Sequence, residues 1–169
     1  DGMKRSSALS RTKPLKRRTK QRRQLTPMQM HDLTERSMLR DGRCAYADWL
    51  VRIRKEIDGE LLTIQTVKEC NGATTFDHWI EPAWIRNHFT DPIDGTDNEA
   101  ISAALLDLRM GKATCAEHHA LRHSGQLLIP VQELTNPEFL DAVEEHGVEA
   151  LEERFQVDNQ RSYEIGGGA

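Results

Sequence analysis

The segment 115–123 constrains this chain most strongly, because one cysteine and three histidines fall within nine residues. Thiolate sulfur and imidazole nitrogen are the usual zinc ligands in proteins. Taken singly, a cysteine is usually a small buried apolar residue, and a histidine is usually core or surface filler. A cluster as dense as this one instead favours a metal site. A bound metal would also help to stabilise the small core that 169 residues allow.

Helical periodicity divides this segment into two faces. His119 and His123 are four residues apart, so they share one face of a helix and can hold one ion. Cys115 and His118 are three residues apart and are also neighbours, but they are turned about 100° from the histidine pair. The pattern therefore predicts two sites, an open one on the histidine pair and a second one that begins with the Cys-His pair.

Cys44 and Cys70 are the only other cysteines, and an odd total of three argues against a closed disulfide framework. We predict that they complete a closed structural zinc site, with the ligand set Cys44, Cys70, Cys115 and His118. The alternative is one zinc that takes its ligands from both faces of the helix. We expect a cytoplasmic location, where thiols stay reduced and available for a metal.

Turn and capping signals predict an α+β chain with short elements. A helix is predicted over 27–40, between a Thr-Pro start and an Asp-Gly stop. Apolar and β-branched residues predict strands or a hairpin over 43–54 and 60–68, with an Asp-Gly turn between them. A short β-type run at 74–76 leads into an Asp-His pair.

The second half of the chain is predicted to be mainly helical. A helix should run over 98–110, followed by a brief strand over 112–114 and a helical segment over 115–123. An Asn-Pro pair then starts a last helical region over 137–155.

The formal net charge of −4 conceals an uneven distribution. Residues 1–24 contain ten Lys/Arg and one acid, whereas the rest of the chain contains 13 Lys/Arg and 26 Asp/Glu. A basic arm on an acidic body is typical of a nucleic-acid-binding tail, and the alternative is a solvated terminus without a partner. We predict a disordered basic arm over 1–25, with DNA contacts from Arg11, Lys13, Lys16, Arg17, Arg18, Lys20, Arg22 and Arg23.

The three tryptophans, Trp49, Trp79 and Trp84, could stack on bases, although core packing is the expected role of at least Trp79.

Two stretches of this sequence together resemble the motif of the HNH, or ββα-metal, nucleases. Residues 76–78 (Phe-Asp-His) are similar to the strand-end pair of that family. Residues 115–123, with the pattern Cys-x-x-His-His-x-x-x-His, are similar to its metal-binding helix. The resemblance covers about residues 43–125, and the Lys-Pro-Leu-Lys run of the arm is similar to that of small phage and prophage nucleases. It implies a small treble-clef-like, zinc-containing ββα-metal domain with helical decoration.

The resemblance also implies roles for individual residues. His78 would be the general base that activates water, because a histidine pKa lies near neutrality. A divalent ion (Mg²⁺, Mn²⁺ or Zn²⁺) would be bound by Asp77, His119 and His123 and would stabilise the scissile phosphate and the leaving 3′ oxygen. Successive strand residues point to opposite faces, so Asp77 can join this centre only if the strand ends or bends there. If Asp77 points away, it could instead orient another group.

The middle Asn of the family motif has no counterpart at the usual distance before the cysteine, where this chain has Met110. Asp107 is the nearest polar substitute, and Asn98 is more distant. Around the motif we predict one HNH nuclease domain over 26–160, followed by a flexible tail over 161–169.

The predicted function is that of a metal-dependent DNA endonuclease used in phage DNA processing or recombination. The runner-up is a non-catalytic, zinc-stapled DNA-binding or recombination accessory protein, and a third reading is a helical interaction module with an incidental histidine cluster. The HExxH metalloprotease, zinc deaminase and Walker A patterns are absent.

We expect DNA as one partner and a recombination or packaging protein as another. We expect no membrane contact, because no apolar run reaches 18 residues. A phage-encoded chain would act in the cytoplasm of the bacterial host.

Overall fold

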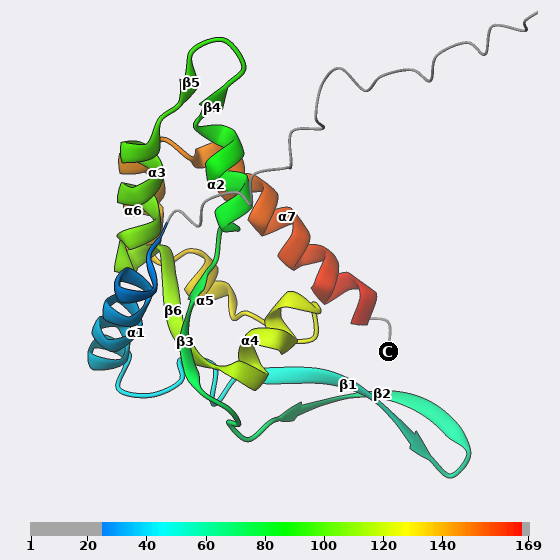
Figure 1. The fold of residues 1–169 in the computed structure, drawn as a ribbon. Helices are drawn as coiled ribbons and strands as arrows, with labels where there is room; N and C mark the ends of the chain where they lie inside the picture. Colours follow the sequence, from blue (N-terminus) through cyan, green and yellow to red (C-terminus); the bar gives the residue numbers. More distant parts are fainter. Residues whose placement is uncertain (1–24, 167–169) are drawn as a thin grey trace, which may run out of the picture.

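The computed structural model describes residues 25–166, which form an α+β fold of short antiparallel strand pairs surrounded by helices (Figure 1). The helices are α1 (Pro27–Asp41), α2 (Pro82–His88), α3 (Asn98–Leu106), α4 (Ala116–His123), α5 (Val131–Leu134), α6 (Pro137–His146) and α7 (Glu149–Gly166). The strands are β1 (Leu50–Ile57), β2 (Glu60–Val67), β3 (Thr74–His78), β4 (Thr90–Asp91), β5 (Gly95–Thr96) and β6 (Gly111–Cys115). None of the helices in this part of the chain combines the length and the apolar character that crossing a membrane requires.

The antiparallel pair β3–β6 and the helix α4 form the centre of the fold. The register pairs Thr74 with Cys115 and His78 with Gly111, and α4 begins directly after β6 and contacts both strands. Gly111 permits this close pairing, because a Cβ atom there would lie 2.0 Å from the carbonyl oxygen of Asp77. In Figure 1, α1 lies on one side of the strand pair and α4 on the other. The pair thus places the ends of β3 and β6 next to the first and last turns of α4.

The main core lies between this strand pair and the helices α1, α2, α3, α6 and α7. Leu33 of α1, Ile85 of α2 and Ile101 of α3 are fully buried there, together with Trp79 just after β3. Leu25 is also buried in this core, although the sequence placed it in the arm over 1–25. Burial of these apolar side chains is the main stabilising contribution to the fold.

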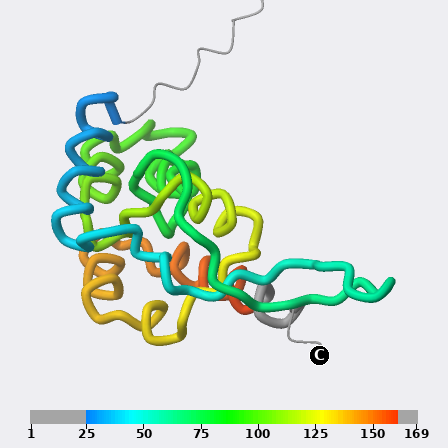
Figure 2. Tube along the Cα trace, turned by 90° about the horizontal axis from the view of Figure 1, so that it is seen from below, coloured from blue at the N-terminus to red at the C-terminus, as the bar shows by residue number. Residues whose placement is uncertain are grey.

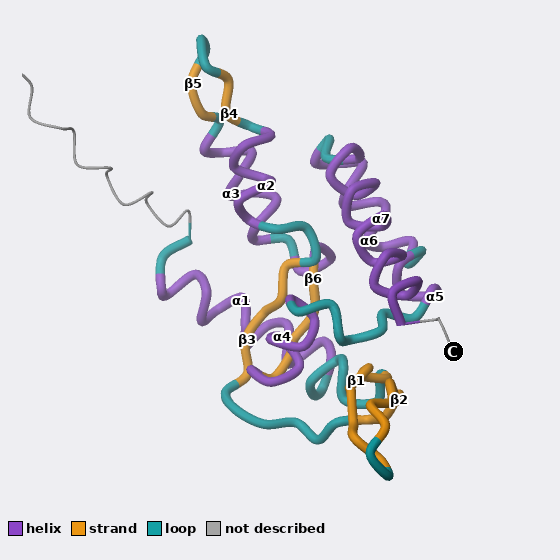
Figure 3. The backbone as a smooth tube through the Cα atoms, turned by 90° about the vertical axis from the view of Figure 1, so that its right-hand side faces the viewer, coloured by secondary structure: helices purple, strands orange, loops and turns teal. Residues whose placement is uncertain are grey.

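The β1–β2 hairpin projects from the body as a two-stranded ribbon (Figure 2). Its base is attached to the segment after α4, because the amide of Arg52 donates to the carbonyl of Gln126 (2.8 Å) and the amide of Leu128 donates to that of Leu50 (2.9 Å). The small β4–β5 hairpin lies at the opposite end of the molecule (Figure 3). The ribbon is therefore held next to the C-terminal end of α4.

Most predicted elements are present, with shifted boundaries. The helix over 27–40 is confirmed, and Gly42 ends it in the left-handed conformation. The hairpin with its Asp-Gly turn is confirmed, but its first strand starts at Leu50 rather than at residue 43. The helix predicted over 98–110 ends at Leu106 and is followed by a 3₁₀ turn, Leu108–Met110.

The prediction for the last helical region, 137–155, and the tail after it was wrong in two respects. Gly147 adopts a φ of 67° and divides the predicted helix into α6 and α7, because a left-handed residue cannot continue a helix. Helix α7 then continues to Gly166, so the backbone of 161–166 is helical where the sequence predicted a flexible tail.

Asp107, the polar residue nearest to the middle position of the nuclease motif, makes structural contacts. Its carboxylate accepts hydrogen bonds from Arg109 Nη2 (2.7 Å) and His146 Nε2 (2.8 Å), and it caps the 3₁₀ turn through the Arg109 amide (2.9 Å). These contacts join the 3₁₀ turn to α6. Asn98, the other candidate, is the first residue of α3.

We expect Asp107→Asn to lower the free energy of unfolding at pH 7 by about 1 kcal/mol, after allowance for solvent screening. Burial alone would raise the pKa of Asp107, but the hydrogen bonds from Arg109 and His146 outweigh it and lower this pKa to about 2. Stabilisation by a carboxylate with a lowered pKa is complete above its unfolded pKa and disappears as the pH falls through the folded value. Denaturant unfolding should therefore separate the two proteins at pH 7 and bring them together near pH 2.

Asp32→Asn is the matched control, because Asp32 makes only an exposed ion pair with Arg36 at 3.7 Å. An exposed pair of this kind contributes little to stability. Equal destabilisation by the two substitutions would contradict a specific role of the Asp107 contacts.

Candidate metal centres and the groups around them

The first centre is the group Cys44, Cys70, Cys115 and His118, whose ligand atoms all lie within 4.8 Å of one another. The Nδ1 atom of His118 lies 2.9 Å from Cys115 Sγ and 3.7 Å from Cys70 Sγ. All three cysteines are free thiols. Three sulfur atoms and one imidazole nitrogen form a donor set that zinc takes in closed tetrahedral sites. The structure thus brings together the four residues that the sequence predicted, close enough to bind one metal ion.

Short-range geometry accounts for the positions of these four ligands. Cys115 is the N-cap of α4 and accepts a hydrogen bond from the amide of His118 at 3.4 Å, so both are fixed by the first turn of the helix. Cys44 follows α1 and is held beside β6 by the amide of Ala45, which donates to the carbonyl of Ala113 at 2.8 Å. Cys70 lies in the connection between β2 and β3. The hairpin insertion therefore returns Cys70 to within reach of Cys44.

The electrostatics of these thiols favour a bound cation. Burial raises the pKa of Cys115, but the amides of His118 and Asn71 and the His118 ring outweigh this effect and lower the pKa to about 7. Partial burial and the neighbouring thiols Cys44 and Cys115 raise the pKa of Cys70 to about 12. Crowded thiolates repel one another, and a divalent cation removes this repulsion because it binds the deprotonated form.

The second centre is the group Asp77, His119 and His123, whose ligand atoms also lie within 4.8 Å of one another. Asp77 Oδ1 lies 3.3 Å from His119 Nε2 and 3.9 Å from His123 Nε2. The two Nε2 atoms are 2.9 Å apart. The two histidines share one face of α4, as their spacing predicted, and the end of β3 brings the carboxylate to the same place. The two groups have no ligand in common, which favours two sites over a single shared one.

The carboxylate of Asp77 is fixed by a hydrogen-bond network that the sequence did not predict. Tyr46 donates its hydroxyl to Asp77 Oδ2 (2.6 Å), and Trp79 Nε1 donates to that hydroxyl (2.8 Å). Arg122 donates from Nη2 to Asp77 Oδ1 (2.5 Å) and from Nε to Oδ2. Burial opposes ionisation of Asp77, but His119, Arg122 and Tyr46 outweigh it and lower its pKa to about 2. Asp77 is therefore a buried, ionised carboxylate in a fixed orientation.

Glu81 orients the second histidine of the pair. Its Oε1 lies 3.2 Å from His123 Nδ1, which is the ring nitrogen opposite the one that faces Asp77 and His119. A carboxylate on the outer nitrogen of a histidine is the usual support of a metal ligand, because it fixes the tautomer and the ring orientation. Burial, and then the charge of Arg122, lower the pKa of His123, which keeps the ring neutral and able to coordinate.

His78 lies beside the second centre but outside its ligand group. Its side chain is buried, and Nε2 donates to the carbonyl of Leu105 at 2.8 Å. The Nδ1 atom then carries the lone pair. Burial lowers the pKa of His78 although the Leu105 carbonyl and Asp77 oppose the shift, so the ring is neutral at pH 7. A neutral, oriented imidazole can accept a proton.

The side chains of Asp77 and His78 contact different elements at the end of β3. Strand β3 ends at His78, and Asp77 faces α4 while His78 contacts the carbonyl of Leu105 at the end of α3. Asp77 therefore lies with His119 and His123, in a group that could hold a metal ion. The alternative, in which Asp77 points away from the histidine pair, is wrong.

The cationic residues predicted to contact DNA from the arm all lie outside the described residues, since the description begins at residue 25. Comparison of the chain with protein-family models, with curated proteins and with solved structures gives no significant match.

Proposed function

We propose that this chain is a metal-dependent DNA endonuclease of the HNH, or ββα-metal, type. The observation that carries the proposal is the convergence of Asp77, His119 and His123 on one point, with the neutral His78 beside them at the end of the same strand. A strand pair followed directly by a helix that supplies two ligands agrees with the resemblance found in the sequence.

The residues of the chain suit phosphodiester hydrolysis. His78 would accept a proton at Nδ1 from a water molecule while the water oxygen attacks phosphorus, and the bond from phosphorus to the 3′ oxygen breaks. A divalent ion on the second centre would supply stabilisation of the charge that develops on the phosphate and on the leaving oxygen. Asp77 would hold its orientation through Tyr46 and Arg122 throughout.

The type of ligand indicates which ion the second centre would take. Two imidazoles and one carboxylate suit Mn²⁺ or Zn²⁺ better than Mg²⁺, which prefers oxygen ligands. The first centre would bind structural zinc, because thiolates select soft ions.

A basic groove supports DNA as the substrate class. It lies between the base of the β1–β2 ribbon and the end of α4, and it is lined by Arg54, Lys68 and the segment 124–126, among others. The groove adjoins His123, the last residue of α4. Cations next to a metal centre would attract the phosphate backbone to an otherwise acidic body. We also propose that a recombination or packaging protein directs the cut.

Cleavage of supercoiled plasmid by the full chain tests the proposal. We expect nicked or linear products with Mn²⁺, weaker cleavage with Mg²⁺ and none after chelation, because the second centre needs its ion. Fresh Mn²⁺ added to zinc-replete, chelator-free protein should restore cleavage, which separates loss of the catalytic ion from unfolding. A zinc-loaded, folded protein that binds DNA without cutting it under any of these ions would contradict the proposal.

A non-catalytic DNA-binding protein is the second candidate, and one observation favours it. The Arg122 guanidinium satisfies the charge of Asp77 without a metal ion, so the carboxylate would be stable in a purely structural role. Arg122→Lys tests the distinction, since a lysine keeps the charge but loses the two-point contact. If the variant binds Mn²⁺ more weakly than the wild-type protein, Arg122 orients a ligand of a metal centre. If neither protein binds Mn²⁺, the second candidate is favoured.

A further inference from the structure

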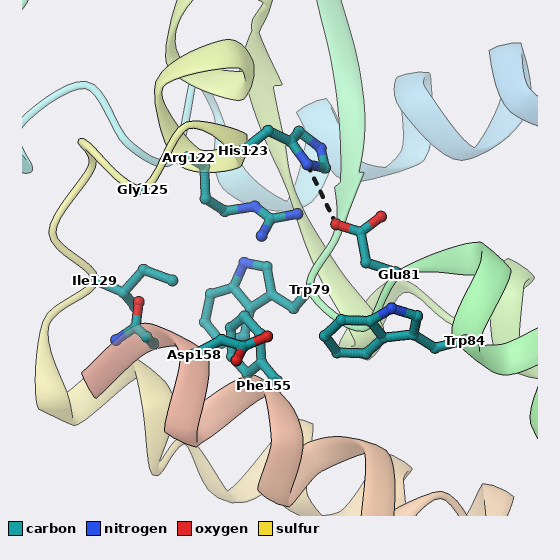
Figure 4. A pocket seen from close by; sticks show the side chains of 10 residues that line it. Trp79, Glu81, Trp84, Arg122, His123, Gly125, Ile129, Phe155 and Asp158 are labelled. Carbon is teal, nitrogen blue, oxygen red and sulfur yellow. Dashed lines mark ion pairs between the residues drawn. The ribbon is translucent and has the colours of Figure 1, made fainter. Parts of the chain in front are cut away.

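A pocket adjoins the second centre on the side of His123. Its volume is about 160 Å³. Figure 4 shows it between the end of α4, the start of α2 and helix α7. This volume exceeds what a single water needs and is smaller than the pockets of drug-sized ligands, so it suits one small ring system. Its main lining residues are Trp79, Glu81, Trp84, His123, Phe155 and Asn159.

Three aromatic side chains, Trp79, Trp84 and Phe155, line part of the pocket. Trp79 is fully buried and stacks on Phe155, with ring centroids 5.7 Å apart and an angle of 20° between the planes. Trp84 is half-buried, and the guanidinium of Arg154 covers its ring at 3.6 Å from the centroid. In Figure 4, Trp84 extends beneath Glu81 and His123. A cation on an aromatic ring fixes its orientation, and an oriented tryptophan is a stacking surface for a planar ligand.

Asn159 provides a hydrogen-bond donor without a protein partner. Asn159 lines the pocket with a side chain that is 8 % exposed, and its Nδ2 atom is buried without a hydrogen-bond partner in the described part of the chain. A buried donor that lacks a partner costs free energy, and the cost disappears when a ligand supplies an acceptor. The pocket therefore has an unfilled donor position in addition to its aromatic side chains.

The charges around the pocket exclude a phosphate as its occupant. Glu81 and Asp158 both line it, and Glu81 is paired with His123. Arg122 is the pocket's only cation besides histidine among the described lining residues, and its guanidinium is already bound to the carboxylate of Asp77. Two carboxylates repel an anion but accept hydrogen bonds from the amino groups of a neutral ring.

We propose that this pocket receives one unstacked nucleobase of the DNA, from a nucleotide that flanks the scissile phosphate. The inference rests on the proposed function, and it specifies the substrate class. Asn159 donates to a ring nitrogen or carbonyl of the base, the carboxylates accept from its amino groups, and Trp84 contacts its face. Removing a base from a paired stack costs a few kcal/mol and costs least where the base is already unpaired. The preferred substrates are therefore DNAs with an unpaired nucleotide, such as bulges, mismatches and branch points.

The binding test uses two matched duplexes that carry 2-aminopurine, unpaired in a single-nucleotide bulge in one and paired in the other. The protein is the full, zinc-loaded chain with His78→Ala, which prevents cleavage during the measurement. We expect about tenfold tighter binding to the bulged duplex, by analogy with the contribution of one base stacked on an aromatic side chain. We also expect quenching of 2-aminopurine fluorescence when the base stacks on Trp84.

Three further substitutions, each in the same background, separate the pocket from a general effect. Asn159→Ala and Trp84→Ala should each remove most of the preference, whereas Trp84→Phe should keep most of it. Gln160→Ala is the matched control, because Gln160 is exposed and is the next residue of the same helix. Asn159→Ala should not lower the melting temperature, since it removes a donor without a partner. A purely structural asparagine would instead show loss of stability with unchanged preference, which would overturn the proposal.

Different results would contradict the nuclease proposal and the pocket proposal. Plasmid cleavage by the wild-type chain with equal affinity for both duplexes would overturn the pocket and leave the nuclease proposal intact. A preference for the bulge that depends on Asn159 and Trp84, in a protein that never cleaves DNA, would support the pocket and overturn the nuclease proposal. Equal quenching by the His78→Ala protein and by the same protein with Asn159→Ala would also overturn the assignment.

Discussion

His78→Ala is expected to reduce DNA cleavage by a factor of about 100 or more, which is the usual loss when a general base is removed. The reason is local, because the hydrogen bond from Nε2 to the Leu105 carbonyl leaves Nδ1 as the proton acceptor. Alanine has no such acceptor, and the surrounding ligands cannot replace it. Single-turnover cleavage of a labelled duplex, at saturating protein and Mn²⁺, measures the chemical step directly.

The effect should be confined to the reaction. His78 is outside both ligand groups, so zinc content, Mn²⁺ binding and DNA affinity should stay near the wild-type values. His88→Ala is the matched control, since His88 is exposed and its Nε2 bonds the carbonyl of Gly147 at 3.0 Å, at a site remote from the second centre. This control should cleave normally. Full activity of the His78→Ala protein would show that His78 is not the general base.

Local sequence patterns predicted the parts of the site that lie on a single element. The spacing of three and four residues along α4 was enough to divide its ligands into two groups, because helix geometry is fixed. The β-type run before the Asp-His pair likewise predicted β3. Turn and capping signals, together with the apolar and β-branched runs, also predicted the α+β class. These features depend on neighbours in the chain and need no knowledge of the packing.

The supporting residues could not be predicted, because they meet only in the folded chain. Tyr46 bonds Asp77 across 31 residues of sequence, and Trp79 bonds Tyr46 across 33. Nothing in their local sequence marks a hydrogen-bonded pair. Arg122 is different, because it follows His119 by three residues on the same side of α4, and this spacing was a usable signal.

Helix ends were predicted less well where one residue decides the backbone conformation. Asp107 ends α3 because its side chain caps the following 3₁₀ turn, although the apolar pattern continues to Met110. Gly147 separates α6 from α7 for a related reason, since glycine adopts the left-handed conformation at low cost. In both places a local conformational preference ends the helix, although the apolar residues continue with helical periodicity.

The Cys₃His group is expected to be essential for folding. If it binds zinc as we propose, Cys115→Ala should abolish tight zinc binding and leave the chain unfolded at room temperature. Structural zinc contributes about 10–16 kcal/mol of apparent binding free energy, which is comparable to or larger than the whole stability of a domain. The second, smaller core supports this expectation, because two of its five buried members are the thiols Cys44 and Cys115, and the other three are Tyr46, Val51 and Leu127.

Cys115 is also the N-cap of α4, so the loss of the cap must be separated from the loss of the metal. Cys115→Ser makes this separation, because serine is a good N-cap but a poor zinc ligand, and a cap contributes only about 1 kcal/mol. We expect the serine protein to be as unfolded as the alanine protein, as measured by thermal unfolding and by metal content after gel filtration. Cys44→Ala and Cys70→Ala should also lose zinc, whereas unchanged melting temperatures in both would show that these two cysteines are not ligands. A serine protein that regains wild-type stability without zinc would mean that the cap, and not a metal, holds the start of α4 against β3 and β6.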